Sequence, residues 1–315
     1  MFWNKKNRRS TNTTRLSVET LEDRKLMAGN VLAVYNPVTR NLTLTGDAAN
    51  NQVEVRAVAA GGNMFVTGLG TTTINGLPQI AIPGPALNIV NTQMGTGSDS
   101  LRFIDTYMSQ ILTQELGADN DGVLLQNVRV QNAVNINTLD GDDNVRVSGI
   151  FAGNIRINTA GGNDQVTVSG RSGVAFTPTF QVAENYVFGG AIGGGRLLEI
   201  LTGDDKDSVQ LVGLQHDGRV SIDTGDHNDF VRTFNTQVAD RVDLFTRAGD
   251  DEVQIATTRT PIFASRLGDG DDKLRIDAFS LANIPGFAVD GGIGIDTVDK
   301  GGLAGGLLVN VEIIL

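Results

Sequence analysis

Short acidic segments punctuated by glycine recur along most of the chain, and their carboxyl groups are the side chains best suited to chemistry. They are LDGDD at 139–143, AGGND at 160–164, TGDDKD at 202–207, TGDHND at 224–229, AGDD at 248–251, LGDGDD at 267–272 and GGIGID at 291–296. Carboxylates and turn carbonyls are hard oxygen ligands of the kind that calcium prefers. The same carboxylates can instead accept backbone N–H groups and cap turns. The sequence leaves both roles open.

The candidate calcium ligands are the turn aspartates that neighbouring repeats both supply. They are Asp140, Asp142, Asp143, Asp229, Asp250, Asp251, Asp269, Asp271, Asp272 and Asp296, densest toward the C-terminus. If the repeats stack about 4.8 Å apart, unit charges repel by about 1 kcal/mol in water and about 3–4 kcal/mol at an effective dielectric constant of 20. Such a column needs compensation, which bound calcium would supply.

One period places these acidic turns at regular intervals. Taking the residue that ends each turn as an anchor, the clear anchors are Asp99, Asp143, Asp164, Asp207, Asp229, Asp251, Asp272 and Asp296. Two longer gaps predict further anchors at Asp121 and Asn185, and stepping back twice from Asp99 by 24 residues gives Asn75 and Asn51. The spacing indicates about twelve repeats of roughly 22 residues, which is a solenoid period.

Two aliphatic or aromatic positions accompany every anchor. Two residues after the anchors lie Val53, Leu77, Leu101, Val123, Val145, Val166, Val187, Val209, Val231, Val253, Leu274 and Val298. Nine residues before them lie Leu42, Val66, Val90, Leu112, Val134, Ile155, Phe176, Leu198, Val220, Val242, Phe263 and Phe287. A constant step across the turn, with variable length elsewhere, is what stacked coils require.

These patterns predict an all-β parallel β-helix or β-solenoid of about twelve coils, a rod of roughly 55–60 Å. We expect one solenoid domain at 31–315, with an N-terminal hairpin cap at about 31–46 and a closing strand at about 307–315. At 104–116 the apolar residues follow helical spacing, so a short helix is an alternative to a strand there.

The segment GGIGIDTV from Gly291 resembles the nonapeptide of hemolysin-type (RTX) calcium-binding repeats at every specified position, and the segment from Leu267 to Leu274 does so with Leu267 in place of a glycine. The resemblance implies calcium held between turns of successive coils. The chain departs from that family because its coils are longer and carry one acidic turn, so calcium could line only one edge.

Residues 1–30 are basic, with seven Lys or Arg against three Asp or Glu, and are expected to be a disordered export or sorting segment outside the fold. Within them, RLSVETLEDRKLM at 15–27 resembles the LEPR-XLL motif of exported planctomycete proteins, with Asp23 in place of Pro and Met27 in place of Leu. The resemblance implies a secreted or cell-surface protein.

Charge and residue types narrow the function. The net charge is −11, so the chain beyond residue 30 carries −15, which disfavours nucleic acid. No apolar run is long enough to span a membrane. Cysteine is absent and only two histidines occur, so thiolate and zinc chemistry lack their residues.

We therefore expect a non-enzymatic structural or adhesive surface or matrix protein, a rod stabilised by calcium and partnered by cell-surface polysaccharide or other surface proteins. The alternative is a carbohydrate-active right-handed β-helix enzyme, a polysaccharide lyase or hydrolase, with Asp204, Asp205, Lys206 and Asp207 as its candidate cluster.

Overall fold

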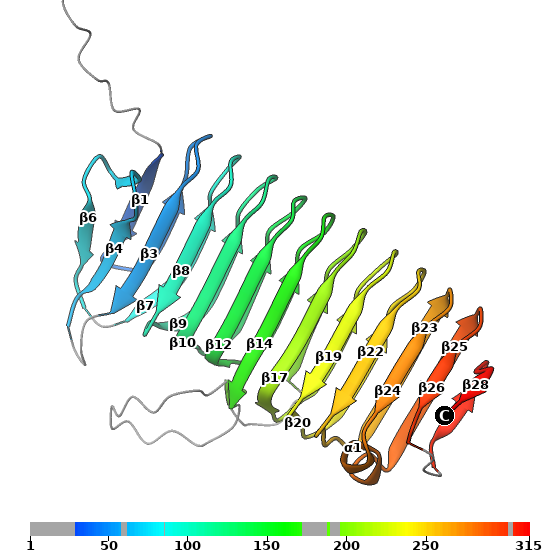
Figure 1. Cartoon of the computed structure of the whole chain (residues 1–315). Coiled ribbons are helices and arrows are strands. Elements are labelled where there is room, and N and C mark those ends of the chain that lie inside the picture. Colours follow the sequence, from blue (N-terminus) through cyan, green and yellow to red (C-terminus); the bar gives the residue numbers. More distant parts are fainter. Residues whose placement is uncertain (1–28, 58–61, 85, 172–187, 190–195, 302–304) are drawn as a thin grey trace, which may run out of the picture.

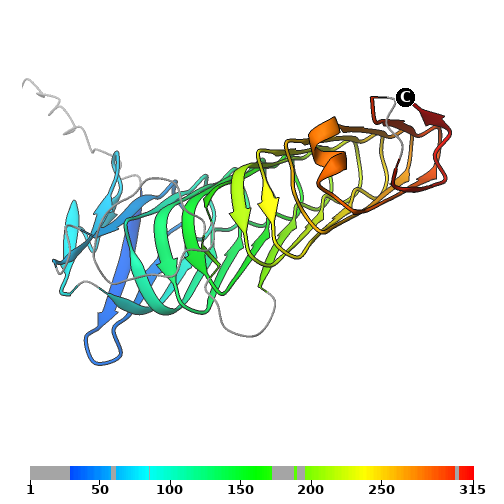
Figure 2. The same cartoon turned by 90° about the horizontal axis from the view of Figure 1, so that it is seen from below.

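The chain folds into a parallel β-solenoid of about nine turns, with successive coils about 22 residues apart (Figure 1). The computed structural model describes residues 29–57, 62–84, 86–171, 188–189, 196–301 and 305–315. Seen from below, the coils stack along a rod, and the helix α1 (Ala278–Ala282) projects from its side (Figure 2). The predicted all-β solenoid class is confirmed. The export segment at 1–30 lies almost wholly outside the described residues.

Two parallel sheets form the long sides of the rod. The first sheet follows the acidic turns and consists of β3 (Gln52–Ala57), β8 (Ser100–Ile104), β10 (Gly122–Val130), β12 (Asn144–Ala152), β14 (Gln165–Arg171), β17 (Ser208–His216), β19 (Phe230–Phe234), β22 (Glu252–Ala256), β24 (Lys273–Ile276) and β26 (Thr297–Asp299). The second sheet precedes the turns and consists of β2 (Asn41–Thr45), β7 (Leu87–Gln93), β9 (Tyr107–Glu115), β11 (Ala133–Asn137), β13 (Asn154–Asn158), β16 (Leu197–Leu201), β18 (Arg219–Asp223), β21 (Arg241–Phe245), β23 (Ile262–Asp269) and β25 (Gly286–Ile293).

The core is built from two continuous rows of apolar side chains. On the first sheet, register pairs Val123 with Val145, Val145 with Val166 and Val166 with Val209, and the row continues to Val298. On the second sheet, a row runs from Leu42 to Phe287. All of these side chains are buried. Full burial of one such side chain contributes about 1.5–3 kcal/mol, so stability is spread along the rod.

The predicted number of coils was too high, because two of the proposed anchors are not part of the stack. Strand β3 pairs directly with β8, so no coil is centred on Asn75, and Leu77 is 54% exposed. Strand β14 pairs directly with β17, so no coil intervenes there either, and Asn185 lies outside the described residues. A longer step can hold an inserted segment instead of a coil, because the entropic cost of a loop grows only slowly with length.

The two ends differ in strand direction. At the N-terminal end, β1 (Asn30–Asn36) forms an antiparallel hairpin with β2 and also pairs with β5 (Thr73–Ile74). In the same region β4 (Met64–Gly68) is antiparallel to both β3 and β6 (Gln79–Ile82). At the C-terminal end, β27 (Leu307–Val309) and β28 (Ile313–Ile314) add in parallel to β25 and β26.

The helical alternative for 104–116 is wrong. Residues 107–115 form β9, which pairs with β7 and β11, and its Met108 and Leu112 are buried at inward positions of a strand. Pairing on both sides outweighs local helical spacing.

Within the described ranges the one α-helix is α1 (Ala278–Ala282), which the sequence reasoning did not predict. Its N-cap Asp277 accepts a hydrogen bond from the Ser280 N–H at 2.7 Å. No helix in the described part of the chain is long and apolar enough to cross a membrane.

Candidate functional site

The anchors of the acidic turns form one hydrogen-bonded column, here called the inner ladder. The backbone N–H of each anchor donates to Oδ1 of the anchor in the next coil, at 2.6–3.0 Å. The members are Asp99, Asp121, Asp143, Asp164, Asp207, Asp229, Asp251, Asp272 and Asp296. Asn51 begins the ladder through its N–H, and Glu312 ends it by accepting from the Asp296 N–H at 2.9 Å.

The residues just before the anchors form a second column, the outer ladder, whose hydrogen bonds run in the opposite direction. The Asp250 N–H donates back to Asn228 Oδ1 at 3.0 Å, and the Asp271 N–H donates back to Asp250 Oδ1 at 2.9 Å. Asn120, Asp142 and Asp271 accept in the same way. Successive backbone N–H groups in an extended chain point to opposite sides, so the two adjacent positions bond to opposite neighbours.

Two left-handed backbone positions, two and four residues before the anchor, give each turn that ends at an inner-ladder aspartate its shape. At four residues before, Gly225 has a φ of +88°, and a Cβ there would lie 1.7 Å from the Gly203 carbonyl oxygen below it. At two residues before, His227 has a φ of +84°. Glycine adopts this region without steric cost. The spaced glycines of the RTX-like segments at Gly292 and Gly294 occupy the same two positions, so backbone shape alone accounts for their pattern.

Burial changes the protonation of the inner ladder. It raises the pKa of Asp121, Asp164 and Asp229 to about 8, with like charge from neighbouring carboxyls adding to the effect. For the remaining members the pKa rises to about 7 at Asp207, Asp251 and Asp272 and to about 6 at Asp99 and Asp143, and it is also raised at Asp296. The backbone N–H bonds oppose these increases without cancelling them. Near neutral pH the ladder therefore carries far less charge than its residue types suggest.

The second carboxyl oxygen, Oδ2, of every inner-ladder aspartate is buried without a hydrogen-bond partner. In the five coils from Asp143 to Asp251, a buried threonine lies five residues before the anchor, as Thr224 does before Asp229. Thr224 opposes the rise in the pKa of Asp229, although its Oγ1 and the buried Oδ2 do not form a regular hydrogen bond. A proton on Oδ2 reduces the cost of burying these oxygens, because a neutral carboxyl is cheaper to bury than a carboxylate.

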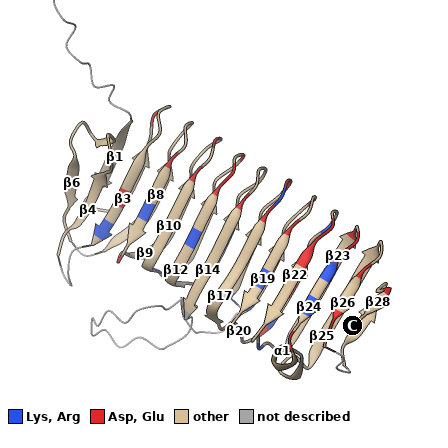
Figure 3. Ribbon diagram, in the orientation of Figure 1, with Lys and Arg blue, Asp and Glu red and all other residues tan. Residues whose placement is uncertain are grey.

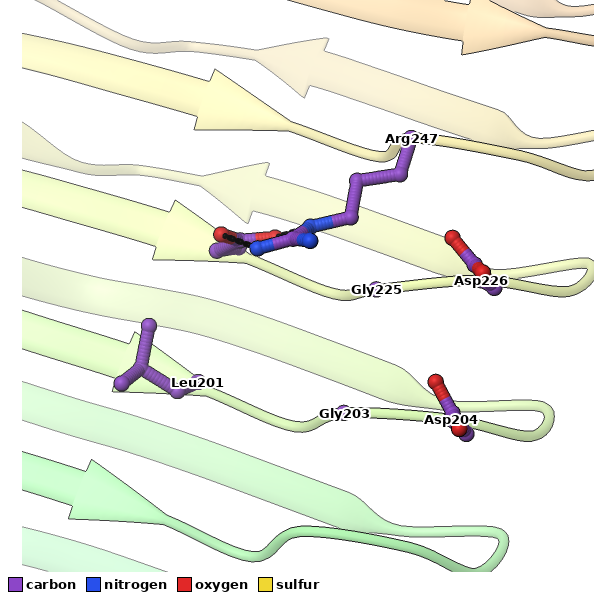
Figure 4. A pocket seen from close by; sticks show the side chains of 7 residues that line it. Leu201, Gly203, Asp204, Gly225, Asp226 and Arg247 are labelled. Carbon is purple, nitrogen blue, oxygen red and sulfur yellow. Dashed lines mark hydrogen bonds and ion pairs between the residues drawn. The ribbon is translucent and has the colours of Figure 1, made fainter.

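Exposed charge gathers at the turn tips around a shallow hollow that includes Asp204, Asp223, Asp226 and Arg247 (Figure 4). Arg247 holds Asp223 with two hydrogen bonds, from Nε and Nη2, each 2.6 Å long. Asp204 and Asp226 are exposed on adjacent coils. The Arg247 guanidinium is thus bound to the Asp223 carboxylate, while the nearby carboxylates of Asp204 and Asp226 face solvent.

The ten predicted ligands fall into three groups. Asp143, Asp229, Asp251, Asp272 and Asp296 belong to the buried inner ladder, and Asp142, Asp250 and Asp271 to the outer ladder. Asp140 and Asp269 are exposed two residues before the outer-ladder positions. The predicted C-terminal cluster is therefore divided among three columns.

This arrangement does not fit calcium at the inner ladder. Calcium takes six to eight oxygens, whereas each of these carboxyls gives one oxygen to a backbone N–H and turns the other into the protein interior. Across the described ranges, no three His, Cys, Asp or Glu side chains gather as metal ligands. The oxygens that remain open to a hard cation are the exposed ones at the turn tips, such as those of Asp140, Asp204, Asp226 and Asp269.

Sequence reasoning missed the outer ladder, Glu312 and the Arg247–Asp223 pair. The outer ladder had a usable signal, because Asn or Asp recurs directly before the anchors at Asn120, Asp142, Asn228, Asp250 and Asp271. Glu312 had none, since it lies 16 residues beyond Asp296 and outside the 22-residue period.

Comparison with protein-family models, with curated proteins and with solved structures gives no match for this chain.

Proposed function

We propose that the protein is an exported, non-enzymatic structural or adhesive component of a cell surface or extracellular matrix. The observation that supports this best is the uniformity of the rod. In the part of the chain that the structure describes, the inner ladder recurs without a break and the outer ladder recurs in most coils, and no coil there is set apart as a reaction centre would be. The anchors from Asn51 to Asp296 span about 43 Å at about 4.8 Å per coil, which suits a spacer or a repetitive binding surface.

Export is the first part of the proposal to test. Cells expressing the full chain and a form lacking residues 1–28, which keeps Asn30 of β1, should be fractionated, with the periplasmic or medium fraction measured by immunoblot. We expect only the full chain to leave the cytoplasm, while both forms give the same melting temperature. Equal retention of both forms would overturn the export role of the N-terminal segment.

Calcium stays a prediction, now confined to exposed carboxylates at the turn tips. A ligand that binds only the folded state at a hundredfold excess over its dissociation constant stabilises that state by about 2.7 kcal/mol. We expect calcium to raise the melting temperature more than magnesium does, and Asp204→Asn with Asp226→Asn to reduce the increase. If millimolar calcium leaves the melting temperature unchanged, the calcium prediction is wrong and the aspartates serve only as turn caps.

The alternative of a polysaccharide lyase or hydrolase has less support. Of its candidate cluster, Asp207 is buried in the inner ladder, where its Oδ1 accepts the Asp164 N–H at 2.7 Å. Asp204 and Asp205 are exposed at a turn tip, and the nearest arginine in the hollow, Arg247, is bound to Asp223. Release of unsaturated or reducing sugar ends from acidic polysaccharides would favour the enzyme over the structural protein.

A further inference from the structure

The outward face of the first sheet carries one straight row of side chains along the rod, which are polar or basic except for Leu124. Register aligns Arg102, Leu124, Arg146, Thr167, Gln210, Arg232, Gln254 and Arg275 on successive coils. The row is bounded by Glu54 beside Arg102 and by Asp299 beside Arg275, and no acidic residue lies in the row between these two arginines. In Figure 3 the acidic residues lie mainly at the turns, whereas basic residues appear on the strands of this sheet.

The arginines of this row are not neutralised by the protein. Arg102, Arg146 and Arg275 are exposed, and none of them makes an ion pair with a residue in the described part of the chain. On the second sheet and at its turn, by contrast, Arg156 pairs with Glu199 at 3.3 Å and Arg219 with Asp243 at 2.7 Å. The first sheet therefore carries three exposed, unpaired arginines in one line, whereas the second sheet carries such an arginine at Arg266, in a chain whose net charge is −11.

The spacing of these charges indicates the kind of anion that fits. The four arginines are two, three and two coils apart, about 10, 14 and 10 Å at the spacing of parallel strands. Duplex DNA carries one charge per about 1.7 Å, so it would bring many unmatched phosphates toward the acidic turns. A linear polymer with sparse anionic groups matches the row without that repulsion.

The side chains between and beside the arginines suit a sugar polymer. Thr167 and the amide oxygens of Gln210 and Gln254 offer hydrogen-bonding groups for hydroxyls in the same row, while the two amide Nε2 groups donate to Ser208 and Glu252. On β19, Phe230 and the exposed Phe234 flank Arg232, whose guanidinium lies 5.2 Å from the centre of the Phe234 ring. Aromatic faces beside a cation provide flat apolar surface for the C–H face of a sugar ring.

We propose that this row, from Arg102 to Arg275, binds a linear acidic polysaccharide of low charge density along the axis of the rod. The inference rests on the proposed function and adds its partner. The polymer's carboxylate or sulfate groups pair with successive arginines, and its hydroxyls bond to the amide and hydroxyl side chains between them.

The test uses the full chain and fluorescently labelled hyaluronan, which carries one carboxylate on every second sugar. Binding is measured by fluorescence anisotropy at low salt. The row variant is Arg146→Gln with Arg232→Gln. The control variant is Arg156→Gln with Arg266→Gln, which makes the same change in net charge on exposed residues of the second sheet. Unchanged melting temperatures for both variants show that the fold is intact.

We expect the row variant to bind about tenfold more weakly, since it loses two exposed ion pairs, while the control binds as the wild type does. Added salt should weaken wild-type binding, and neutral dextran should not bind. Equal losses in both variants, tighter binding of duplex DNA, or no wild-type binding to hyaluronan would each overturn the inference. None of these results would affect the export experiment, so the two proposals can fail separately.

Discussion

Asp229 lies in the middle of the inner ladder, and Asp229→Asn tests whether buried protons hold the ladder together. Its Oδ1 accepts the Asp207 N–H at 2.9 Å, a bond that the Asn amide oxygen can keep. Asn51 shows that Asn is compatible with an anchor position, because its Nδ2 donates to the Ala49 carbonyl oxygen at 2.7 Å. The substitution therefore removes the ionisable group while preserving the turn hydrogen bond.

The size of the effect follows from the pKa of Asp229. That pKa is about 8 in the folded protein against 3.8 for the unperturbed side chain. The folded state therefore holds the proton more tightly, so the free energy of unfolding falls as pH rises from about 4 to about 8 and levels off above that. At 1.36 kcal/mol per pH unit, the ionised carboxyl costs up to about 6 kcal/mol, an upper limit because neighbouring carboxyls titrate together.

Thermal melts followed by circular dichroism at pH 5, 7 and 9 measure this cost. We expect the Asn variant to melt close to the wild type at pH 5 and clearly above it at pH 9, by about 2–4 °C per kcal/mol. Asp226→Asn, an exposed change three residues away, should follow the wild-type curve. Parallel pH curves for Asp229→Asn and the wild type would refute the reasoning, because Asp229 would then titrate normally in the folded state.

Three further substitution pairs test other parts of the structure by the same melts. Val209→Asp should unfold the middle coils, because an unpaired buried carboxylate costs several kcal/mol. Gln210→Asp, on the outward side of the same strand, should leave the melting temperature nearly unchanged. Similar melting temperatures for the two variants would mean that the sheet register is wrong. Gly225→Ala should destabilise by more than about 3 kcal/mol through its 1.7 Å clash with backbone, and Gly213→Ala, with nothing within 4 Å, by only about 1–2 kcal/mol. Arg247→Met should lower the free energy of unfolding by about 1 kcal/mol, because it loses the exposed ion pair with Asp223. Arg247→Gly loses the same ion pair but relieves the backbone strain of a φ of +62°, so its loss of stability should be smaller. A larger loss for the Gly variant than for the Met variant would contradict this reasoning.

The sequence predicted the stacked core well because inward side chains follow from period alone. The residues two after and nine before the ten real anchors, such as Val145 and Val134, all lie in the two buried rows. Period could not distinguish a coil from an insertion of similar length, which is why Asn75 was wrongly assigned an anchor role. The segment around Asn75 instead lies at the N-terminal end of the rod, where β5 pairs with β1 and β6 pairs with β4.

The candidate site could be predicted only in part, because an aspartate in a stacked turn has the same residue type whether it binds a cation or a backbone N–H. The choice depends on where each oxygen points. For Asp272, one oxygen meets the Asp251 N–H at 2.8 Å and the other faces the interior, and no sequence pattern contains that information.

The antiparallel strands at the N-terminal end have a consequence for the order of folding. The β1–β2 hairpin closes a short loop, whereas every coil must join strands 21 or more residues apart. Loop closure is less costly for the hairpin, so it can form first and offer β2 as a template to β7. Each later coil then adds to the edge left by the one before, in the order in which the chain is synthesised. A polypeptide delivered N-terminus first can therefore fold as it emerges, without waiting for its C-terminal half.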